Sequence, residues 1–161
     1  ISTRLFCYSF FDRQLIMRGF DLRQGREFLS LKDISVSELD VEVITPVSEA
    51  ATGDEMVAHL RASNRTEAYV VDTDGKLLGV VPILTALAAQ NSAASSLINA
   101  DYLVLKLSDD LQQALSVARQ FVGEAIPVID DSGALVGCIS EGAILGGTLD
   151  RQEEVKGRER N

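Results

Sequence analysis

Acidic clusters and a single histidine are the side chains of this sequence best suited to bind a metal ion or to act as a base. Asp72-Thr73-Asp74-Gly75 resembles the start of a calcium-binding loop, in which alternating carboxylates supply oxygen ligands. Such a loop ends in a bidentate glutamate, and the corresponding position holds Ile83. We therefore interpret the segment as a tight turn. His59 has no Cys or Ser motif beside it, so we predict a solvated helix residue.

The two cysteines, Cys7 and Cys138, are far apart and lie in unlike surroundings. Neither a disulfide framework nor a metal knuckle follows from that spacing, and a reducing compartment suits the chain. Cys138 falls within an apolar run, which predicts a buried, inert thiol, with a redox sensor as the alternative. The sequence also has no nucleophile elbow, no metal-ligand cluster and no phosphate-binding Gly-Lys loop, so we do not expect an enzyme.

Composition and charge exclude further classes of function. The 161 residues are 46% hydrophobic and 24% charged, which suits a folded globular unit, and the net charge is −9 without any Lys or Arg cluster. Nucleic acid is therefore not an expected partner. The uncharged stretch 77–100 is interrupted by Gly79, Pro82 and Thr85, whereas a membrane span needs about 20 apolar residues, so we expect a buried strand and helix there. Since the chain starts at Ile1, we expect a fragment of a larger protein.

An internal repeat organises the chain. When the sequence is compared with itself at an offset of 58 positions, without a gap, most apolar residues fall on apolar residues. Identical pairs include Ser37/Ser95, Leu39/Leu97, Arg61/Arg119, Val70/Val128, Asp72/Asp130, Gly75/Gly133, Leu77/Leu135, Gly79/Gly137 and Leu87/Leu145. The chain is one unit written twice, and each unit of about 58 residues is small enough to need the other for a stable core.

Each copy begins with an extended stretch, residues 41–47 and 101–107, followed by a helix. In the first copy Thr52 and Glu55 form a capping box. In the second copy we predict Ser108 as the N-cap, ahead of an apolar face that recurs at helical spacing. The residues of that face are Leu111, Ala114, Leu115, Ala118 and Val122.

Two hairpins, at residues 69–81 and 126–139, follow these helices, and each turn ends in a glycine that accepts a positive φ. A second helix then closes each copy, opened by Pro82 in the first and by Ser140 as cap in the second. The predicted order is strand, helix, strand, strand, helix, which gives an α/β (α+β) fold with a ligand-sized cleft between the copies. We expect the tail, residues 150–161, to be a solvated or frayed end.

The repeated pattern of an apolar pair, Asp, a turn, Gly, apolar residues and a second Gly, at 70–81 and 128–139, resembles the signature of CBS domains. The resemblance covers residues 34–149 and implies two βαββα units, 34–90 and 91–149, packed about a pseudo-two-fold axis as a Bateman-type module. It also implies adenine nucleotides in the inter-domain clefts, with ATP, ADP or AMP as candidate ligands, and association into a homodimer.

The leader, residues 1–33, sharpens the expected host. Residues 9–27 are similar to the linker that joins the last membrane helix of ClC chloride channels and transporters to their cytosolic CBS pair. Ser9 and Asp12 make a capping box for a short helix that Gly19 ends. The resemblance implies a regulatory domain on the cytoplasmic face of a membrane, partnered by its own transmembrane chloride-transport domain. A sensor module of a magnesium transporter, a nucleotide-metabolising enzyme or a free-standing protein is the alternative.

The family's nucleotide motif, Gly-apolar-x-Ser/Thr-x-x-Asp, is incomplete in both copies. The first copy has Pro82 in the hydroxyl position and Thr85 in the aspartate position, and the second has Ser140 followed by Ala143. Without the ribose-binding carboxylates, nucleotide affinity is expected to be weak or lost. Ser140 is then a helix cap or a phosphate contact, and Tyr69 is a core residue or an adenine-stacking one.

Overall fold

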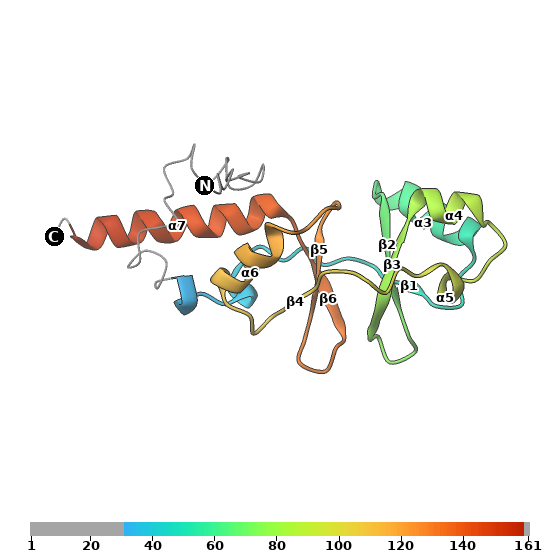
Figure 1. Cartoon of the computed structure of the whole chain (residues 1–161), viewed down its shortest axis with the longest axis horizontal. Coiled ribbons are helices and arrows are strands. Elements are labelled where there is room, and N and C mark those ends of the chain that lie inside the picture. Colours follow the sequence, from blue (N-terminus) through green and yellow to red (C-terminus); the bar gives the residue numbers. More distant parts are fainter. Residues whose placement is uncertain (1–30, 160–161) are drawn as a thin grey trace, which may run out of the picture.

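The computed structural model describes residues 31–159, which form two halves that each contain a three-stranded sheet and helices (Figure 1). In Figure 1 the two sheets face each other at the centre and the helices lie on the outer sides. The first half comprises β1 (Val47–Ser48), α3 (Gly53–Ser63), β2 (Glu67–Val71), β3 (Leu77–Pro82), α4 (Ile83–Ala88) and α5 (Ala94–Leu97). The second comprises β4 (Leu105–Lys106), α6 (Leu111–Ala118), β5 (Ile126–Ile129), β6 (Leu135–Ile139) and α7 (Glu141–Glu159). The predicted fold class and element order are confirmed.

The strand pairing repeats in register. β1 runs parallel to β2 with Val47 opposite Val70, and β4 runs parallel to β5 with Leu105 opposite Val128, again at an offset of 58. Each sheet then adds an antiparallel hairpin strand. Both hairpins carry an irregularity directly after the same strand position, Val70 and Val128. The sequence repeat is therefore a structural repeat.

The hairpin turns are closed by their aspartates. The Asp72 carboxylate accepts hydrogen bonds from the backbone N–H groups of Asp74 and Lys76, both at 2.9 Å, and Gly75 has a φ of 80°. In the second hairpin the hydrogen bond from the Ser132 hydroxyl lowers the pKa of Asp130, and Gly133 has a φ of 88°. Both carboxylates accept hydrogen bonds within their own turns, as the interpretation of these segments as tight turns predicted.

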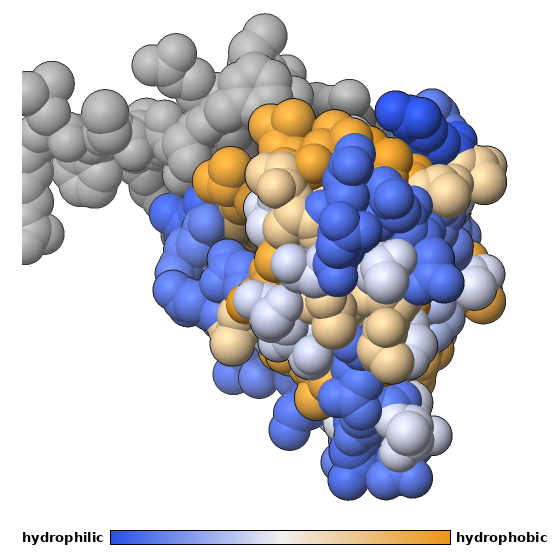
Figure 2. Space-filling view, turned by 90° about the vertical axis from the view of Figure 1, so that its right-hand side faces the viewer, coloured by the Kyte–Doolittle hydropathy of each residue, from blue (hydrophilic) through white to orange (hydrophobic). Residues whose placement is uncertain are grey.

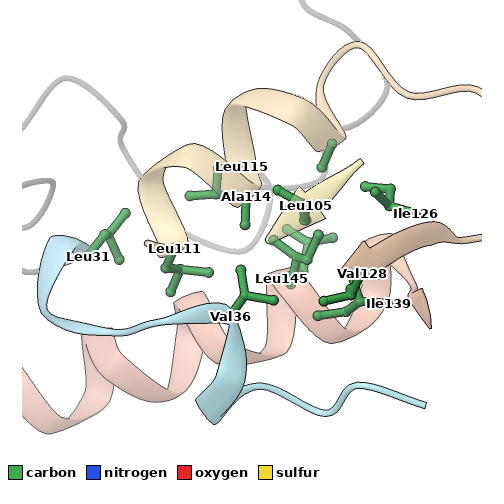
Figure 3. Close-up of a cluster of buried hydrophobic side chains, with 12 residues drawn as sticks. Leu31, Val36, Leu105, Leu111, Ala114, Leu115, Ile126, Val128, Ile139 and Leu145 are labelled. Carbon is green, nitrogen blue, oxygen red and sulfur yellow. The ribbon is translucent and has the colours of Figure 1, made fainter. Parts of the chain in front are cut away.

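Segments are exchanged between the halves. Residues 31–38 lie before the first repeat's strands, yet Leu31 and Val36 are buried in the core of the second half (Figure 3). That core gathers side chains from β4, α6, β5, β6 and α7 around them. Conversely, Ala94 lies in the core of the first half, where its backbone N–H donates to the carbonyl of Ala51 at 2.7 Å. Each core therefore contains residues from a segment that adjoins the other half in sequence, which links the two halves covalently and by packing.

Two glycines mark the points where the exchanged segments cross. Glu42 pairs with Cys138 on β6 through two backbone hydrogen bonds of 2.9 Å, and Asn99 pairs with Val80 on β3 at 3.0 and 3.3 Å. A Cβ on Gly137 would overlap the backbone carbonyl oxygen of Glu42, and one on Gly79 would overlap the side chain of Ile98. Only glycine permits this close approach of two backbones. These crossings fix how the halves face each other.

Several sequence predictions were wrong in detail. The extended stretches 41–47 and 101–107 contribute only Val47 and Leu105–Lys106 to the strands. The N-cap of α6 is Asp110, whose carboxylate accepts from Gln113 N–H at 2.8 Å, because Gln113 completes a capping box that Ser108 lacks. Val122 is 95% exposed, since α6 ends at Ala118.

The termini of the repeats also differ from expectation. Residues 150–159 continue α7 as regular helix, with Asp150, Glu153 and Glu154 exposed, so the tail predicted to be solvated or frayed is a solvated helix over that range. On α4, predicted to be a buried helix, Leu84 is 75% exposed.

The capping box of Thr52 and Glu55 at the start of α3 is confirmed. No helix within residues 31–159 is long and apolar enough to cross a membrane.

Candidate ligand cleft between the two halves

A cleft of about 380 Å³, here called the first cleft, lies between the two sheets. Its walls combine strand residues of both halves with the connection that joins them. The residues that line it are Glu67, Val80, Pro82, Asn99, Asp101, Tyr102, Leu103, Gln120, Phe121, Val122, Ala125 and Pro127. A cavity of this volume suits a small organic ligand.

The connection 99–103 is held over the first cleft by the crossing at β3. The backbone pairing of Asn99 with Val80 places the connection against the strand, and the Asn99 side chain accepts from Asp101 N–H at 3.0 Å. Tyr102 is anchored by its hydroxyl, which donates to the carbonyl of Leu77 at 3.3 Å. Burial raises the pKa of Tyr102, so the phenol stays protonated as a donor.

Glu67 enters the first cleft from the start of β2. Its side chain is half-buried, and one carboxylate oxygen accepts from the backbone N–H of Glu124 at 3.2 Å. The Glu124 carboxylate in turn accepts from Thr66 N–H and from the Thr66 hydroxyl, both at 2.8 Å. These bonds join the two halves and hold the Glu67 carboxylate in place.

A second, smaller cleft of about 190 Å³ occupies the pseudo-equivalent position. It is lined by Glu42, Val43, Ile44, Thr45, His59, Ser63, Arg65, Glu67, Ala68 and Tyr69. The guanidinium of Arg65 lies in it, 2.6 Å from a carboxylate oxygen of Glu42 and 3.4 Å from one of Glu124. Burial by itself lowers the pKa of Arg65, but the hydrogen bond to Glu42 and the neighbouring negative charges raise it overall. Arg65 is a fixed cation in this cleft.

The seam between the sheets is a small apolar cluster of Tyr69, Ala125 and Cys138. Tyr69 is 3% exposed, and its hydroxyl donates to the carbonyl of Ala125 at 2.8 Å. Burial raises the pKa of Tyr69 and also that of Cys138. The predicted burial of the Cys138 thiol is therefore confirmed, and Tyr69 lies in the seam as well as along the second cleft.

The structure separates the five residues chosen from the sequence. Pro82 lines the first cleft, whereas Thr85 lies half-buried on α4 and lines neither described cleft. Ser140 caps α7, because its hydroxyl oxygen accepts from Ala143 N–H at 3.1 Å. Ala143 packs against the core of the second half. Tyr69 belongs to the seam, as described above.

Sequence reasoning missed the polar residues of the connection and one histidine. Asn99, Asp101 and Tyr102 line the first cleft, and the signal that would have found them is the second glycine of the hairpin, where a crossing segment must approach. His59, predicted to be solvated, is half-buried in the second cleft with Nε2 3.1 Å from the carbonyl oxygen of Thr45. The prediction was wrong in part: the side chain is only half solvated, because Thr45 lies against it.

Comparisons with known proteins agree with this architecture. Residues 94–148 match the CBS domain family. A CBS domain pair/ACT domain protein from Thermotoga maritima is 25% identical, with a TM-score of 0.63 over 73% of this chain and 98% of that one. CBSX2 in complex with AMP is 20% identical, with a TM-score of 0.63 over 74% of this chain and 98% of that one. The cytosolic domain of the Mg²⁺ channel MgtE in complex with ATP is 20% identical, with a TM-score of 0.64 over 84% of this chain and 58% of that one.

A curated relative, homoserine O-acetyltransferase from Methanohalophilus mahii, is 27% identical over 117 residues. The match covers 71% of this chain, and the chain spans only 24% of the length of that relative. The repeat, the paired sheets and these similarities together identify residues 31–159 as having the fold of a CBS domain pair, and the match to the CBS domain model lies within the second unit.

Proposed function

We propose that this chain is a regulatory CBS-pair module of a ClC-type chloride channel or chloride/proton antiporter, attached at the cytoplasmic face of the membrane to its own transmembrane transport domain. The observation that carries the regulatory role is the first cleft, whose walls come from both halves and from their connection. A ligand there contacts both halves at once, so its binding energy depends on how they sit relative to each other. The halves are the element that a ligand would bias.

The leader, residues 1–33, supports a ClC-type protein as the host of the module. Residues 9–27, which lie outside the described residues, carry the resemblance to the ClC linker. The likeness of the fold to the cytosolic domain of the channel MgtE supports a transport protein as host in general terms. The coding sequence upstream of Ile1 tests the proposal, and about ten or more hydrophobic spans of about 20 residues are expected. If these spans are absent, the module belongs to another kind of host protein.

Adenine nucleotides are the ligands to test first. In the first repeat the hydroxyl position of the family motif is Pro82, which has neither a hydroxyl nor a backbone N–H to offer a phosphate. The aspartate position holds Thr85, and Ala143 holds it in the second repeat. We expect titration calorimetry with ATP, ADP and AMP to show weak binding or none. Tight binding of any of them would favour a nucleotide sensor instead, which is the alternative function.

That alternative has support of its own. The structures of CBSX2 with AMP and of the MgtE cytosolic domain with ATP show that proteins of this fold hold adenine nucleotides. A sensor of another transporter, of an enzyme or of a free-standing protein would share the first cleft. Nucleotide affinity and the upstream sequence together distinguish the two functions.

A homodimer is the proposed assembly. Leu84 on α4 is 75% exposed and Leu87 is 37% exposed, one turn apart on the same helix. Figure 2 views the molecule from the end formed by the first half and shows hydrophobic surface gathered along its upper edge, where Figure 1 places α4. Sedimentation of the Leu84→Glu variant tests this surface, with Val122→Glu as a control at another exposed site. The dimer should dissociate with the first change only.

A further inference from the structure

The two clefts differ in volume and in charge, and one pair of repeat positions contributes to both differences. Arg65 in the first repeat corresponds to Gly123 in the second. Arg65 places its guanidinium in the second cleft and pairs it with Glu42 and Glu124, so an internal cation occupies that space. Gly123 adds no side chain to the first cleft, which has about twice the volume, 380 Å³ against 190 Å³. Of the two described clefts, the first therefore offers a ligand the larger space.

The first cleft has an acidic, hydrogen-bonding lining. Its charged residues are Glu67 and Asp101, and its amides are those of Asn99 and Gln120. Among residues 31–159, none that lines it is a Lys, Arg or His. The two carboxylates repel a phosphate group, and the lining has no basic side chain to offset that repulsion, so it disfavours a phosphorylated ligand in spite of the amide N–H donors.

The rest of the lining suits the opposite charge. Carboxylates pair with ammonium groups through charge-assisted hydrogen bonds. Two aromatic rings, Tyr102 and Phe121, also line the cavity and would attract a cation near their faces or stack on a flat ligand body. Val80, Ala125 and Pro127 complete an apolar wall for that body.

We propose that the first cleft binds an organic cation, an ammonium group carried on a flat or apolar body, and discriminates against the corresponding phosphate ester. The inference rests on the proposed function in one respect, that the module responds to a ligand in this cleft. It adds the chemical class of that ligand. In the second cleft, carboxylates bind the guanidinium of Arg65 in the way that we propose for the carboxylates of the first cleft and the ligand's ammonium group.

Three compounds that share one body and differ in charge test the proposal. 5′-Amino-5′-deoxyadenosine, adenosine and AMP carry an ammonium, a hydroxyl and a phosphate on the same carbon. Titration calorimetry on the whole chain should give affinities that fall in that order, with about a tenfold or greater difference between the ammonium compound and AMP. Equal or tighter binding of AMP would overturn the inference while leaving a ligand-responsive module in place. Binding of none of the three would also overturn it and would leave only the dimerisation role of the proposed function.

Two charge-neutral variants locate the effect. Glu67→Gln keeps an acceptor for Glu124 N–H, and Asp101→Asn changes an exposed side chain, so both variants are expected to fold. Each should reduce the preference for the ammonium compound over adenosine several-fold. Asp74→Asn, in the first hairpin turn and outside both clefts, removes the same charge and should leave the preference unchanged. An equal loss in all three variants would show a long-range charge effect and refute a site in the first cleft.

Discussion

The crossing of residue 42 over β6 gives the sharpest test of how the two halves are held together. Replacing Gly137 by Ala adds a Cβ that overlaps the backbone carbonyl oxygen of Glu42 and lies 3.1 Å from Val41 Cγ1. The obstacle is backbone, which cannot rotate away as the end of a flexible side chain can. The crossing segment must therefore move off the strand.

The cost follows from what that movement breaks. Two backbone hydrogen bonds, Glu42 N–H to the Cys138 carbonyl and Cys138 N–H to the Glu42 carbonyl, are each 2.9 Å long. Their loss costs about 1 kcal/mol each, and overpacking of a buried site costs about 1–3 kcal/mol, while the gain from restricting the unfolded chain is below about 1 kcal/mol. We expect the free energy of unfolding to fall by about 2–5 kcal/mol, a large part of the stability of a small domain.

Urea unfolding followed by circular dichroism measures this loss, and Gly146→Ala is the matched control. Gly146 lies on α7, and a Cβ there meets nothing within 4 Å, so alanine should stabilise the helix by up to about 1 kcal/mol. If Gly137→Ala loses less than about 0.5 kcal/mol, the close crossing of the backbones is not what holds the halves together.

Three further changes probe the seam and the second cleft. Tyr69→Phe removes the hydroxyl that donates to the buried carbonyl of Ala125 and should cost about 1–2 kcal/mol in urea unfolding; an unchanged midpoint would mean that the bond does not stabilise the seam. In a Cys7→Ser background, iodoacetamide should alkylate Cys138 much more slowly in the native protein than in urea, since burial raises the pKa of this thiol; equal rates would contradict its burial. Because the folded-state pKa is raised, ionisation of the thiol opposes folding, so the stability it contributes at neutral pH is lost as the pH rises through that pKa. Arg65→Gly enlarges the second cleft, removes its cation and should add a second binding event in titrations with 5′-amino-5′-deoxyadenosine; a single event would show that the guanidinium is not what excludes this compound from the second cleft.

Much of the fold could be predicted from local patterns. The hairpin turns follow from Asp72 and Gly75 and from their partners in the second repeat, because an aspartate and a positive φ define such turns within a few residues. The capping box at Thr52 is also a local device. The cap of α6 was misplaced at Ser108 because three adjacent polar residues are each good caps, and only Gln113 at the correct spacing decides for Asp110.

The candidate site was less predictable, since its residues are remote in sequence. The family motif points to Pro82 and Ser140, but it does not reveal that Glu67 and Asp101 meet across a cleft. His59 was assigned to solvent because nothing near it in sequence shows that residues 42–45 lie against α3. Such contacts depend on where a connection crosses, which no periodicity encodes.

The sequence by itself determined that the chain is one βαββα unit written twice, because register, turns and caps depend on neighbouring residues and recur at a fixed offset. The tertiary structure decided how the halves exchange segments and which cleft has the larger volume. One backbone approaches another closely at Gly137 and at Gly79. Arg65 lies in the second cleft, whereas Gly123, its counterpart, adds no side chain to the first. A difference between the repeats such as Arg65 and Gly123 changes a cleft only because packing brings together side chains that are remote in sequence.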